Sequence, residues 1–506
     1  MRQNKTYSPR VLPLVSAVLG AVVSVLAFPP FGPGWLIVPG VALFLAAMRL
    51  VRTTRQGLAV GAVYGLAFYG GLMWWMSELG IVAVVPLVLV LTLFVALYGW
   101  WLSRYSQIEP GKWLLLAVGG WALMELVRYH FPFNGLEWGA SGYALSDNIW
   151  TRFPAAVVGT SGLTVLVVAL AGSLALAALR EWSRMAGITL SVALALLAGA
   201  LVYKTTNGIE DVVVGPTAIV QGSTPCPYEH CPPDERFGTY TQHLELTKTI
   251  PPDSVSLVVW SEGSTGSVNA DPVQNPEVGD AIGAEARRIG ARILVGSDRP
   301  LSDTEWINAN VVFDPSGEIV GEYRKQHPVP FGEYIPFRPL FEWIPALDQV
   351  SRDMIPGDGP VIFDDGQIKL GSVISFEWSF SRYARQNALA GAEVIVVATN
   401  EGSYGTTPAS DQFIGMTRMR AVELGVPVIH AAVTGKSTII DANGEFGETT
   451  GLATQEILEG HHGTSNPTPY AVAGDLLLYL AVIVGVIMWW RTRSLVGSDP
   501  PKSEED

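Results

Sequence analysis

The chain is poor in charged residues and has no excess of basic ones. Only 15% of its 506 residues are Asp, Glu, Lys or Arg, whereas 49% are hydrophobic. Soluble globular proteins carry about 25% charged residues, so we expect part of this chain to insert into a membrane. Acidic residues outnumber basic ones by 46 to 32, which gives a net charge of −14. Phosphate binding needs a concentrated basic surface, so we expect no nucleic-acid partner.

Cysteine is also scarce. The only two, Cys226 and Cys231, stand in the segment Cys-Pro-Tyr-Glu-His-Cys. In an oxidising environment this spacing predicts a local disulfide. The alternative is a weak metal site with His230 as a third ligand, although a solvated loop histidine is the simpler interpretation. The sequence has no zinc signature, phosphate loop or Cys-x-x-Cys motif, so we expect no metal and no cofactor.

Long apolar runs are abundant. They cover residues 11–28, 35–50, 57–75, 80–102, 113–127, 155–179, 188–203 and 474–490. Several approach the roughly 20 residues that cross a bilayer, and the shorter ones can tilt or end in interfacial aromatic residues. The sequence therefore predicts seven transmembrane helices before a polar block and one after it.

Basic residues fall on alternate connections between these runs. They are Arg2, Lys5 and Arg10, then Arg49, Arg52 and Arg55, then Arg104 and Lys112, then Arg180 and Arg184, and finally Arg491 and Arg493. The positive-inside rule then places both termini in the cytoplasm and the polar block outside a bacterial cytoplasmic membrane. The first run could instead be a cleaved signal peptide, but Phe28-Pro29-Pro30 follows where small residues are needed, which favours an uncleaved span.

We therefore predict four parts: a membrane domain of seven spans (residues 1–204), an extracytoplasmic domain (205–470), a C-terminal transmembrane helix (471–493) and a disordered polar cytoplasmic tail (494–506).

In the extracytoplasmic domain, short β-branched runs alternate with helical patterns, which predicts an α/β layered fold. Strands are expected at 212–221, 257–260, 292–296, 307–313, 318–323, 369–374, 394–398, 428–432 and 437–441, with helices at 236–249, 280–289, 378–390 and 411–424. Residues 314–317 and 441–444 are expected to be tight turns between antiparallel strands.

Three residues with catalytic side chains stand at the ends of predicted strands: Glu262, Lys325 and Ser375. Each has an ordinary interpretation. An isolated Glu after a strand is usually a surface acid, and a Lys before a turn is usually solvated. Ser375 lies between a strand and a predicted helix, where it could be an N-cap; the alternative is an elbow that exposes the hydroxyl at a helix N-terminus.

These three residues occur together with further motifs, and the combination resembles the apolipoprotein N-acyltransferases, the membrane-embedded branch of the nitrilase superfamily. The motifs are Val-Pro-Phe-Gly-Glu-Tyr-Ile-Pro at 329–336, Ser375-Phe-Glu377, Thr399-Asn400 and Arg-Met-Arg-Ala-Val-Glu at 418–423. The resemblance covers essentially the whole chain. It implies an α-helical transmembrane bundle and an extracytoplasmic nitrilase-like α-β-β-α sandwich.

The resemblance also implies residue roles and a reaction. Glu262 would be the general base, Lys325 the stabiliser of the oxyanion, and residue 375 the nucleophile, with Glu333 and Glu377 as supporting acids. The family reaction is ping-pong. An acyl chain passes from a phospholipid to the enzyme and then to the α-amine of a diacylglyceryl-cysteine on a lipoprotein. The expected partners are therefore a phospholipid donor, a diacylated lipoprotein acceptor and membrane lipid.

The chain departs from the family pattern at the nucleophile. Ser375 replaces cysteine, Phe376 stands where tyrosine is common, and Glu401-Gly402-Ser403 replaces Asp-Ala-Trp. A serine hydroxyl must be activated by an adjacent base, whereas a thiolate forms readily. Ser375 is compatible with a natural serine enzyme, with a homologue that has lost catalysis, and with an engineered exchange that traps substrate. The alternative functions are accordingly a catalytically impaired membrane partner or scaffold, and a membrane-tethered amidase.

Overall fold

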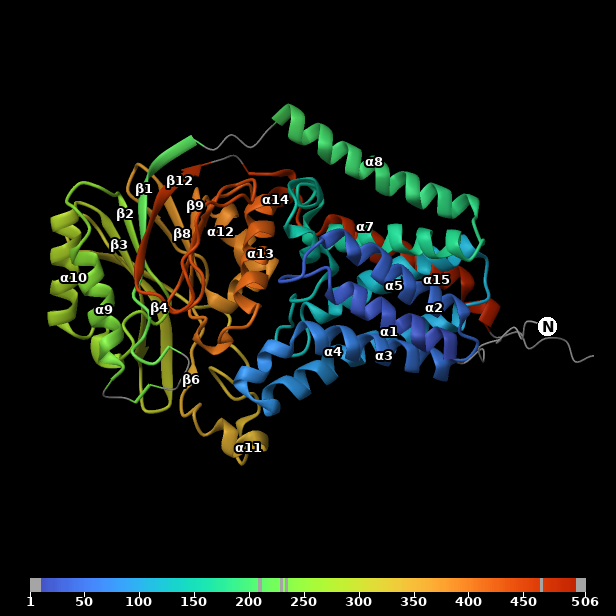
Figure 1. The fold of residues 1–506 in the computed structure, drawn as a ribbon, viewed down its shortest axis with the longest axis horizontal. Coiled ribbons are helices and arrows are strands. Elements are labelled where there is room, and N and C mark those ends of the chain that lie inside the picture. Colours follow the sequence, from blue (N-terminus) through green and yellow to red (C-terminus); the bar gives the residue numbers. More distant parts are fainter. Residues whose placement is uncertain (1–10, 208–211, 228–230, 233–234, 465–466, 497–506) are drawn as a thin grey trace, which may run out of the picture. The chain divides into compact units, whose positions relative to one another are not determined.

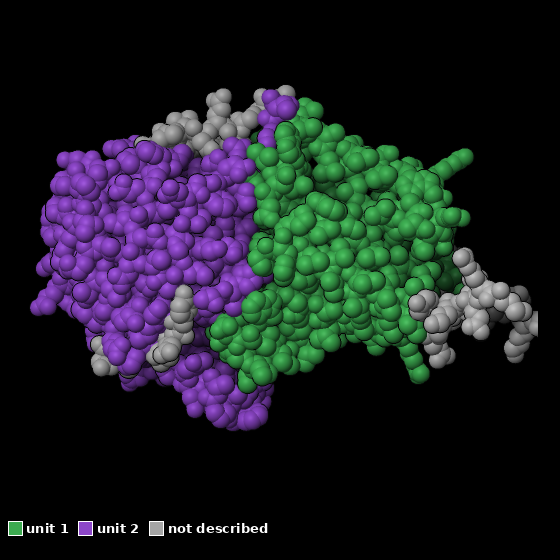
Figure 2. Space-filling model, viewed as in Figure 1, with its two compact units in different colours: residues 1–203, 475–506 green, residues 204–474 purple. Residues whose placement is uncertain are grey.

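The chain forms two compact units in the computed structural model (Figures 1 and 2). One unit holds residues 1–203 and 475–506 and is helical; the other holds residues 204–474 and contains two β-sheets with helices. The structure describes residues 11–207, 212–227, 231–232, 235–464 and 467–496. The predicted tail begins in a short 3₁₀ helix, η9 (Arg493–Val496), and residues 497–506 lie outside the described ranges.

Each of the eight apolar runs forms a helix. They are α1 (Val11–Val25), α2 (Ile37–Leu50), α3 (Thr54–Leu72), α4 (Ile81–Leu102), α5 (Pro110–Arg128), α7 (Ala155–Ala178), α8 (Arg184–Asn207) and α15 (Leu476–Thr492), with a short α6 (Ile149–Arg152) between α5 and α7. Within the described part of the chain, three segments are long and apolar enough to cross a membrane, namely 81–105, 155–178 and 184–205. The topology of eight spans and its sidedness remain predictions.

Glycine allows close contact between helices in this unit. A Cβ atom added at Gly119 of α5 would lie 2.4 Å from the Cα of Gly485 on α15. A Cβ atom added at Gly61 of α3 would lie 2.4 Å from the carbonyl oxygen of Val95 on α4. Small residues at helix interfaces are typical of membrane helix packing, because they let the two backbones approach.

The larger sheet of the second unit has the strand order β12-β1-β2-β3-β4-β5, and β6 pairs with β4. Strands β1, β2 and β3 are parallel, whereas β3-β4-β5 are joined as antiparallel hairpins. The strands are β1 (Val212–Gln221), β2 (Leu257–Trp260), β3 (Arg292–Pro300), β4 (Glu305–Phe313), β5 (Ile319–Arg324), β6 (Asp353–Met354) and β12 (Glu456–Thr464).

The smaller sheet has the order β11-β10-β9-β8-β7, with β8, β9 and β10 parallel. Its strands are β7 (Ile362–Asp364), β8 (Lys369–Ile374), β9 (Val394–Thr399), β10 (Val428–Ala432) and β11 (Thr438–Ile440). The central strand β9 is buried along its whole length, as expected for a parallel strand covered on both faces.

The unit is layered in the order α-β-β-α (Figure 1). One apolar cluster joins the larger sheet to α9 (Phe237–Lys248) and α10 (Pro276–Ile289), and a second fills the space between the two sheets. Helices α12 (Ser381–Leu389) and α13 (Ala409–Leu424) contact strands of the smaller sheet. Short helices α11 (Arg338–Phe341) and α14 (Pro469–Ala473) complete the unit. The predicted α-β-β-α sandwich is thus confirmed.

Some predicted boundaries were wrong. Strands β6, β7 and β12 were not predicted, and α12 begins at Ser381 instead of 378, because Ser375–Ser379 form the 3₁₀ turn η7. The turn at 314–317 does join antiparallel strands, whereas the turn at 441–444 leads only to an isolated bridge between Ile440 and Phe446.

Candidate active site

The candidate residues lie at strand ends of both sheets. Glu262 follows β2 by two residues, Lys325 follows β5 directly, and Ser375 follows β8 directly. Their exposed fractions are 7%, 1% and 8%, so none is an ordinary surface residue. The carboxyl ends of parallel strands are where α/β folds usually bind ligands.

The ammonium group of Lys325 lies between two carboxylates. Its Nζ is 3.2 Å from Oε1 of Glu262 and 2.5 Å from Oε1 of Glu333. Burial alone would lower the pKa of Lys325, but the two carboxylates outweigh burial and raise the pKa above its ordinary value. Burial raises the pKa of Glu333, while Lys325 opposes this shift. Lys325 is therefore a fixed positive charge inside the unit.

Glu262 is held by donors from both sheets. Asn308 Nδ2, on β4, donates to Oε1 at 2.7 Å, and the backbone N–H of Asn400, directly after β9, donates to Oε2 at 2.8 Å. Asn308 was not predicted as a site residue. The available signal was its position in Trp-Ile-Asn-Ala-Asn-Val-Val-Phe, where asparagines interrupt an otherwise apolar strand.

Ser375 forms a strained elbow between β8 and η7. Its φ of +51° lies in the left-handed region, which residues other than glycine rarely adopt, and such strain concentrates at functional sites. Its Oγ lies 3.3 Å from Oγ1 of Thr399. Thr399 is next to Asn400, so the end of β9 contacts both Ser375 and the carboxylate of Glu262.

Both alternatives proposed for Ser375 need correction. Ser375 is not the N-cap of α12, because that helix begins six residues later, at Ser381. For the same reason the expected helix N-terminus does not directly follow Ser375: residues 375–379 form a 3₁₀ turn. The elbow itself is present, as a sharp strand-to-turn connection with Ser375 in the left-handed region.

Glu377 binds the segments that carry Ser375 and Lys325 to each other. Its Oε2 accepts hydrogen bonds from the Ile374 backbone N–H and the Tyr323 hydroxyl, both at 2.8 Å. Its Oε1 accepts from the backbone N–H groups of Gln326 and of His327, the latter at 3.0 Å. Burial raises the pKa of Glu377 to about 7, although these hydrogen bonds favour the charged form.

Glu401, the first residue after Asn400, is directed toward His430. The carboxylate of Glu401 is buried against His430, with Oε1 at 3.1 Å from Nε2.

Cys226 and Cys231 form a disulfide, as predicted, so their thiolates are not available to a metal. His230 lies outside the described residues.

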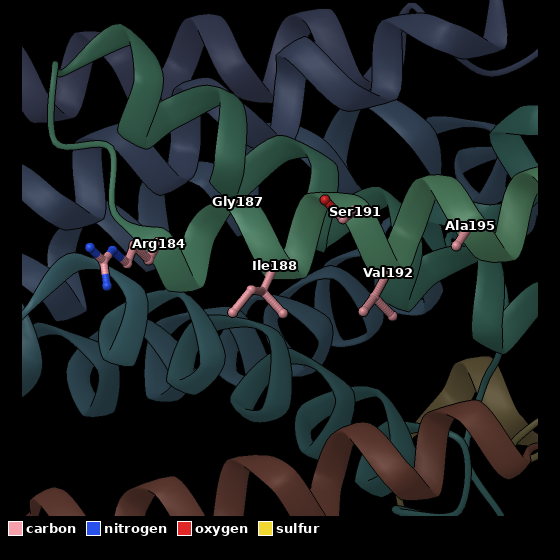
Figure 3. A pocket seen from close by; sticks show the side chains of 6 residues that line it. All are labelled: Arg184, Gly187, Ile188, Ser191, Val192 and Ala195. Carbon is pink, nitrogen blue, oxygen red and sulfur yellow. The ribbon is translucent and has the colours of Figure 1, made fainter.

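A hollow of about 670 Å³ lies along α8 in the helical unit (Figure 3). Its lining consists of Arg184, Gly187, Ile188, Ser191, Val192 and Ala195, and includes none of the candidate catalytic residues. Ile188 and Val192 project from one side of the helix and are 63% and 54% exposed. An exposed apolar face of this kind is typical of a helix that contacts lipid.

Two family models match the chain. The apolipoprotein N-acyltransferase N-terminal domain matches residues 20–173, and the carbon-nitrogen hydrolase domain matches residues 217–461. Proteins named apolipoprotein N-acyltransferase are similar over nearly the whole length. The one from Geobacter metallireducens is 28% identical over 88% of both chains. The one from Mycolicibacterium smegmatis is 28% identical over 96% of this chain and 86% of its own.

Among solved structures, an amidase from Nesterenkonia sp. is similar to this chain. It has 15% sequence identity and a TM-score of 0.39, over 54% of this chain and 97% of the amidase.

Proposed function

Because the chain belongs to the apolipoprotein N-acyltransferase family of enzymes, we propose that it transfers an acyl chain from a phospholipid to the α-amino group of the N-terminal diacylglyceryl-cysteine of lipoproteins. The observation that best supports this is the arrangement at the strand ends. Lys325 is ion-paired with Glu262 and Glu333, and the end of β9 contacts both Ser375, through the Thr399 hydroxyl, and Glu262, through the Asn400 N–H.

In the first half of the reaction, the Ser375 hydroxyl attacks the ester carbonyl of the phospholipid. Glu262 takes the hydroxyl proton as general base, and Lys325 stabilises the negative charge on the tetrahedral oxygen. The ester C–O bond then breaks, and the proton on Glu262 passes to the departing lysophospholipid oxygen. The acyl chain is left as an ester on Ser375.

In the second half, the neutral α-amine of the lipoprotein attacks this ester. A C–N bond forms and the bond between the acyl carbon and Ser375 Oγ breaks. Glu262 accepts the amine proton and returns it to Oγ, so the serine hydroxyl is regenerated and the acceptor leaves as an amide. Glu377 takes no part in proton transfer. It holds the Ser375 elbow and the Lys325 segment in fixed positions relative to each other.

The proposed setting is the bacterial cytoplasmic membrane, with the sheet-containing unit outside. The apolar helices of the other unit support this location, and the basic residues on alternate connections support the orientation. The disulfide fits an oxidising compartment, since disulfides persist there and are rare in the cytosol.

The test compares three versions of position 375 with labelled phospholipid and a synthetic diacylglyceryl-cysteine peptide. Ser375→Ala is expected to abolish the acyl-protein adduct and to lower N-acylation by about 1000-fold or more, because no nucleophile remains. Ser375→Cys is expected to form a thioester and to acylate the peptide at least as fast as the serine protein. Intact-protein mass and peptide mass report the two half-reactions separately.

The outcomes also separate the alternatives. Equal activity of the serine and alanine proteins would show that Ser375 is not the nucleophile. Activity of the cysteine variant alone would identify a disabled acyltransferase with an otherwise intact site. Release of free fatty acid or hydrolysis of amides without peptide acylation would identify an amidase. No adduct in any variant would favour a scaffold.

A further inference from the structure

One acid beside the candidate site has no role in the mechanism above. Asp298 lies near the end of β3. Within this strand Ile293 and Val295 face helices α9 and α10, whereas Leu294 faces the second sheet. Side chains alternate along a strand, so Asp298 projects on the same face as Leu294, toward the space between the sheets.

Glu262 lies over this same face of β3. A Cβ atom added at Gly296 would lie 2.7 Å from the Cα of Glu262, so only glycine permits this approach. Asp298 is the next residue on that face of the strand. It is close enough to interact electrostatically with Glu262, Glu333 and Lys325.

Asn308 is the direct partner of Asp298 across the β3–β4 ladder. Its Nδ2 donates to Glu262, and this bond fixes the orientation of the amide, because a flipped amide would place its oxygen against the carboxylate. Asn308 Oδ1 and Asp298 Oδ1 are both buried and without a hydrogen-bond partner within the described part of the chain. Asn308 is only 3% exposed, so an unmet acceptor there is costly.

The local charge is also unbalanced. Asp298, Glu262 and Glu333 bring three carboxylates around the single ammonium of Lys325. Arg299, the next residue on β3, is engaged by Asp271 and Glu322. Burial and the neighbouring carboxylates raise the pKa of Asp298 to about 7. The unmet acceptor oxygens of two residues paired across the ladder, together with this excess of carboxylates, call for a small cationic donor.

We propose that Asp298 and Asn308 form the subsite that binds the α-ammonium group of the acyl acceptor. The inference rests on the proposed function and names the residues that select an amine over other acceptors. An ammonium group has three N–H donors and a positive charge, so it satisfies both oxygens and restores the charge balance. The ammonium releases one proton to solvent before attack, and Glu262, which Asn308 also binds, would then lie beside the neutral amine and accept its second proton as the C–N bond forms.

The experiment measures binding without turnover, in full-length Ser375→Ala protein in detergent micelles. Two synthetic peptides are compared: the diacylglyceryl-cysteine peptide, and its counterpart with a hydroxyl in place of the α-ammonium. In this background Asp298→Asn is expected to weaken binding of the amine peptide about tenfold, because one buried charge partner is lost. The affinity of the hydroxyl peptide is expected to stay the same, because its hydroxyl group carries no charge for Asp298 to pair with.

Asp303→Asn is the matched control, since it removes an equal charge at an exposed position of the β3–β4 connection. It should leave the affinity ratio of the two peptides unchanged. Thermal unfolding checks that each variant is folded.

If Asp298→Asn leaves the ratio of the affinities for the two peptides unchanged, the proposed ammonium subsite is wrong, whereas the proposed function still stands. A bound water would then be the partner of the two oxygens. Failure of the amine peptide to bind the parent protein would overturn the proposed acceptor, and the subsite with it.

Discussion

Glu377 shows how a single carboxylate can hold together two candidate catalytic segments that are far apart in sequence. Its two oxygens accept hydrogen bonds from the residue before Ser375 and from the two residues after Lys325. All the groups that hydrogen-bond to the Glu377 carboxylate are donors. A side-chain amide cannot replace this carboxylate, because its nitrogen is a donor as well.

We therefore expect Glu377→Gln to lower kcat about 100-fold, because the amide nitrogen would face backbone N–H groups and the elbow would shift. KM for the peptide should change much less, since Glu377 is fully buried and not accessible to a bound peptide. Steady-state kinetics measures both constants. Glu318→Gln, at an exposed position before β5, is the control, and an unchanged kcat in Glu377→Gln would contradict the positioning role.

At this scale the sequence predicts what lies in short contiguous motifs. Glu262, Lys325, Glu333, Ser375 and Glu377 each stand in such a motif, and the structure brings them to one region of the sheet-containing unit. Asp298 and Asn308 could not be found in this way. Their proximity depends on the register of β3 and β4, which no local pattern reveals, although the asparagines that interrupt the apolar strand were a signal for Asn308 alone.

Among the elements, α9 contains a buried histidine that couples folding to pH. Nε2 of His243 accepts a hydrogen bond from the Gly222 N–H at 3.2 Å, and Nδ1 lies 2.7 Å from the Thr239 carbonyl. Both contacts suit the neutral imidazole. Burial lowers the pKa of His243 to about 4, from an ordinary value of 6.5.

Between pH 6.5 and pH 4 the unfolded chain thus binds a proton that the folded chain does not. This histidine's contribution to stability is complete above pH 6.5 and is lost as the pH falls toward 4. We expect the loss to be about 3 kcal/mol, because a tenfold change in proton affinity corresponds to about 1.4 kcal/mol. His243→Gln can make both hydrogen bonds but does not titrate, so its unfolding free energy should fall less on acidification. His461→Gln, at an exposed site on β12, should behave as wild type.

The short segment between Cys226 and Cys231 is expected to be closed by a disulfide in the purified protein. Alkylation without reduction should then leave the intact mass unchanged, whereas alkylation after reduction should label both cysteines. Labelling of both cysteines without reductant would contradict the bond and the oxidising compartment assigned to this unit.

Elements were predictable where the local pattern was strong. Strands β1, β2, β8 and β10 were predicted with their observed bounds, because each is a compact apolar or β-branched run. Strand β12 was missed because Glu-Ile-Leu-Glu-Gly-His-His-Gly-Thr has no regular alternation; it is a strand because it pairs with β1, more than 200 residues away in sequence. The start of α12 was misplaced because the elbow occupies the first turn of the predicted helix.

For the whole molecule, composition already separates an apolar part from a polar one, whereas the orientation rests on basic residues alone. We expect a reporter fused after Tyr203 to be active outside the cytoplasm, because seven spans would precede it. A fusion after Arg180, in a basic connection, should be cytoplasmic and serves as the control. Reporter activity in whole cells measures this, and a cytoplasmic signal after Tyr203 would contradict the topology.

The pairing of β1 with β12 determines how the sheet-containing unit is joined to the rest of the chain. Val212 opens β1 and pairs with Thr464, which closes β12, so the chain enters and leaves the sheet at neighbouring positions. The sheet-containing unit is thus inserted in the sequence between α8 and α15, which follow each other within the helical unit. Because the ends of β1 and β12 are neighbours, a short linker can join them. The sheet-containing unit can therefore be produced for study as a circularly closed domain, without the helices of the other unit.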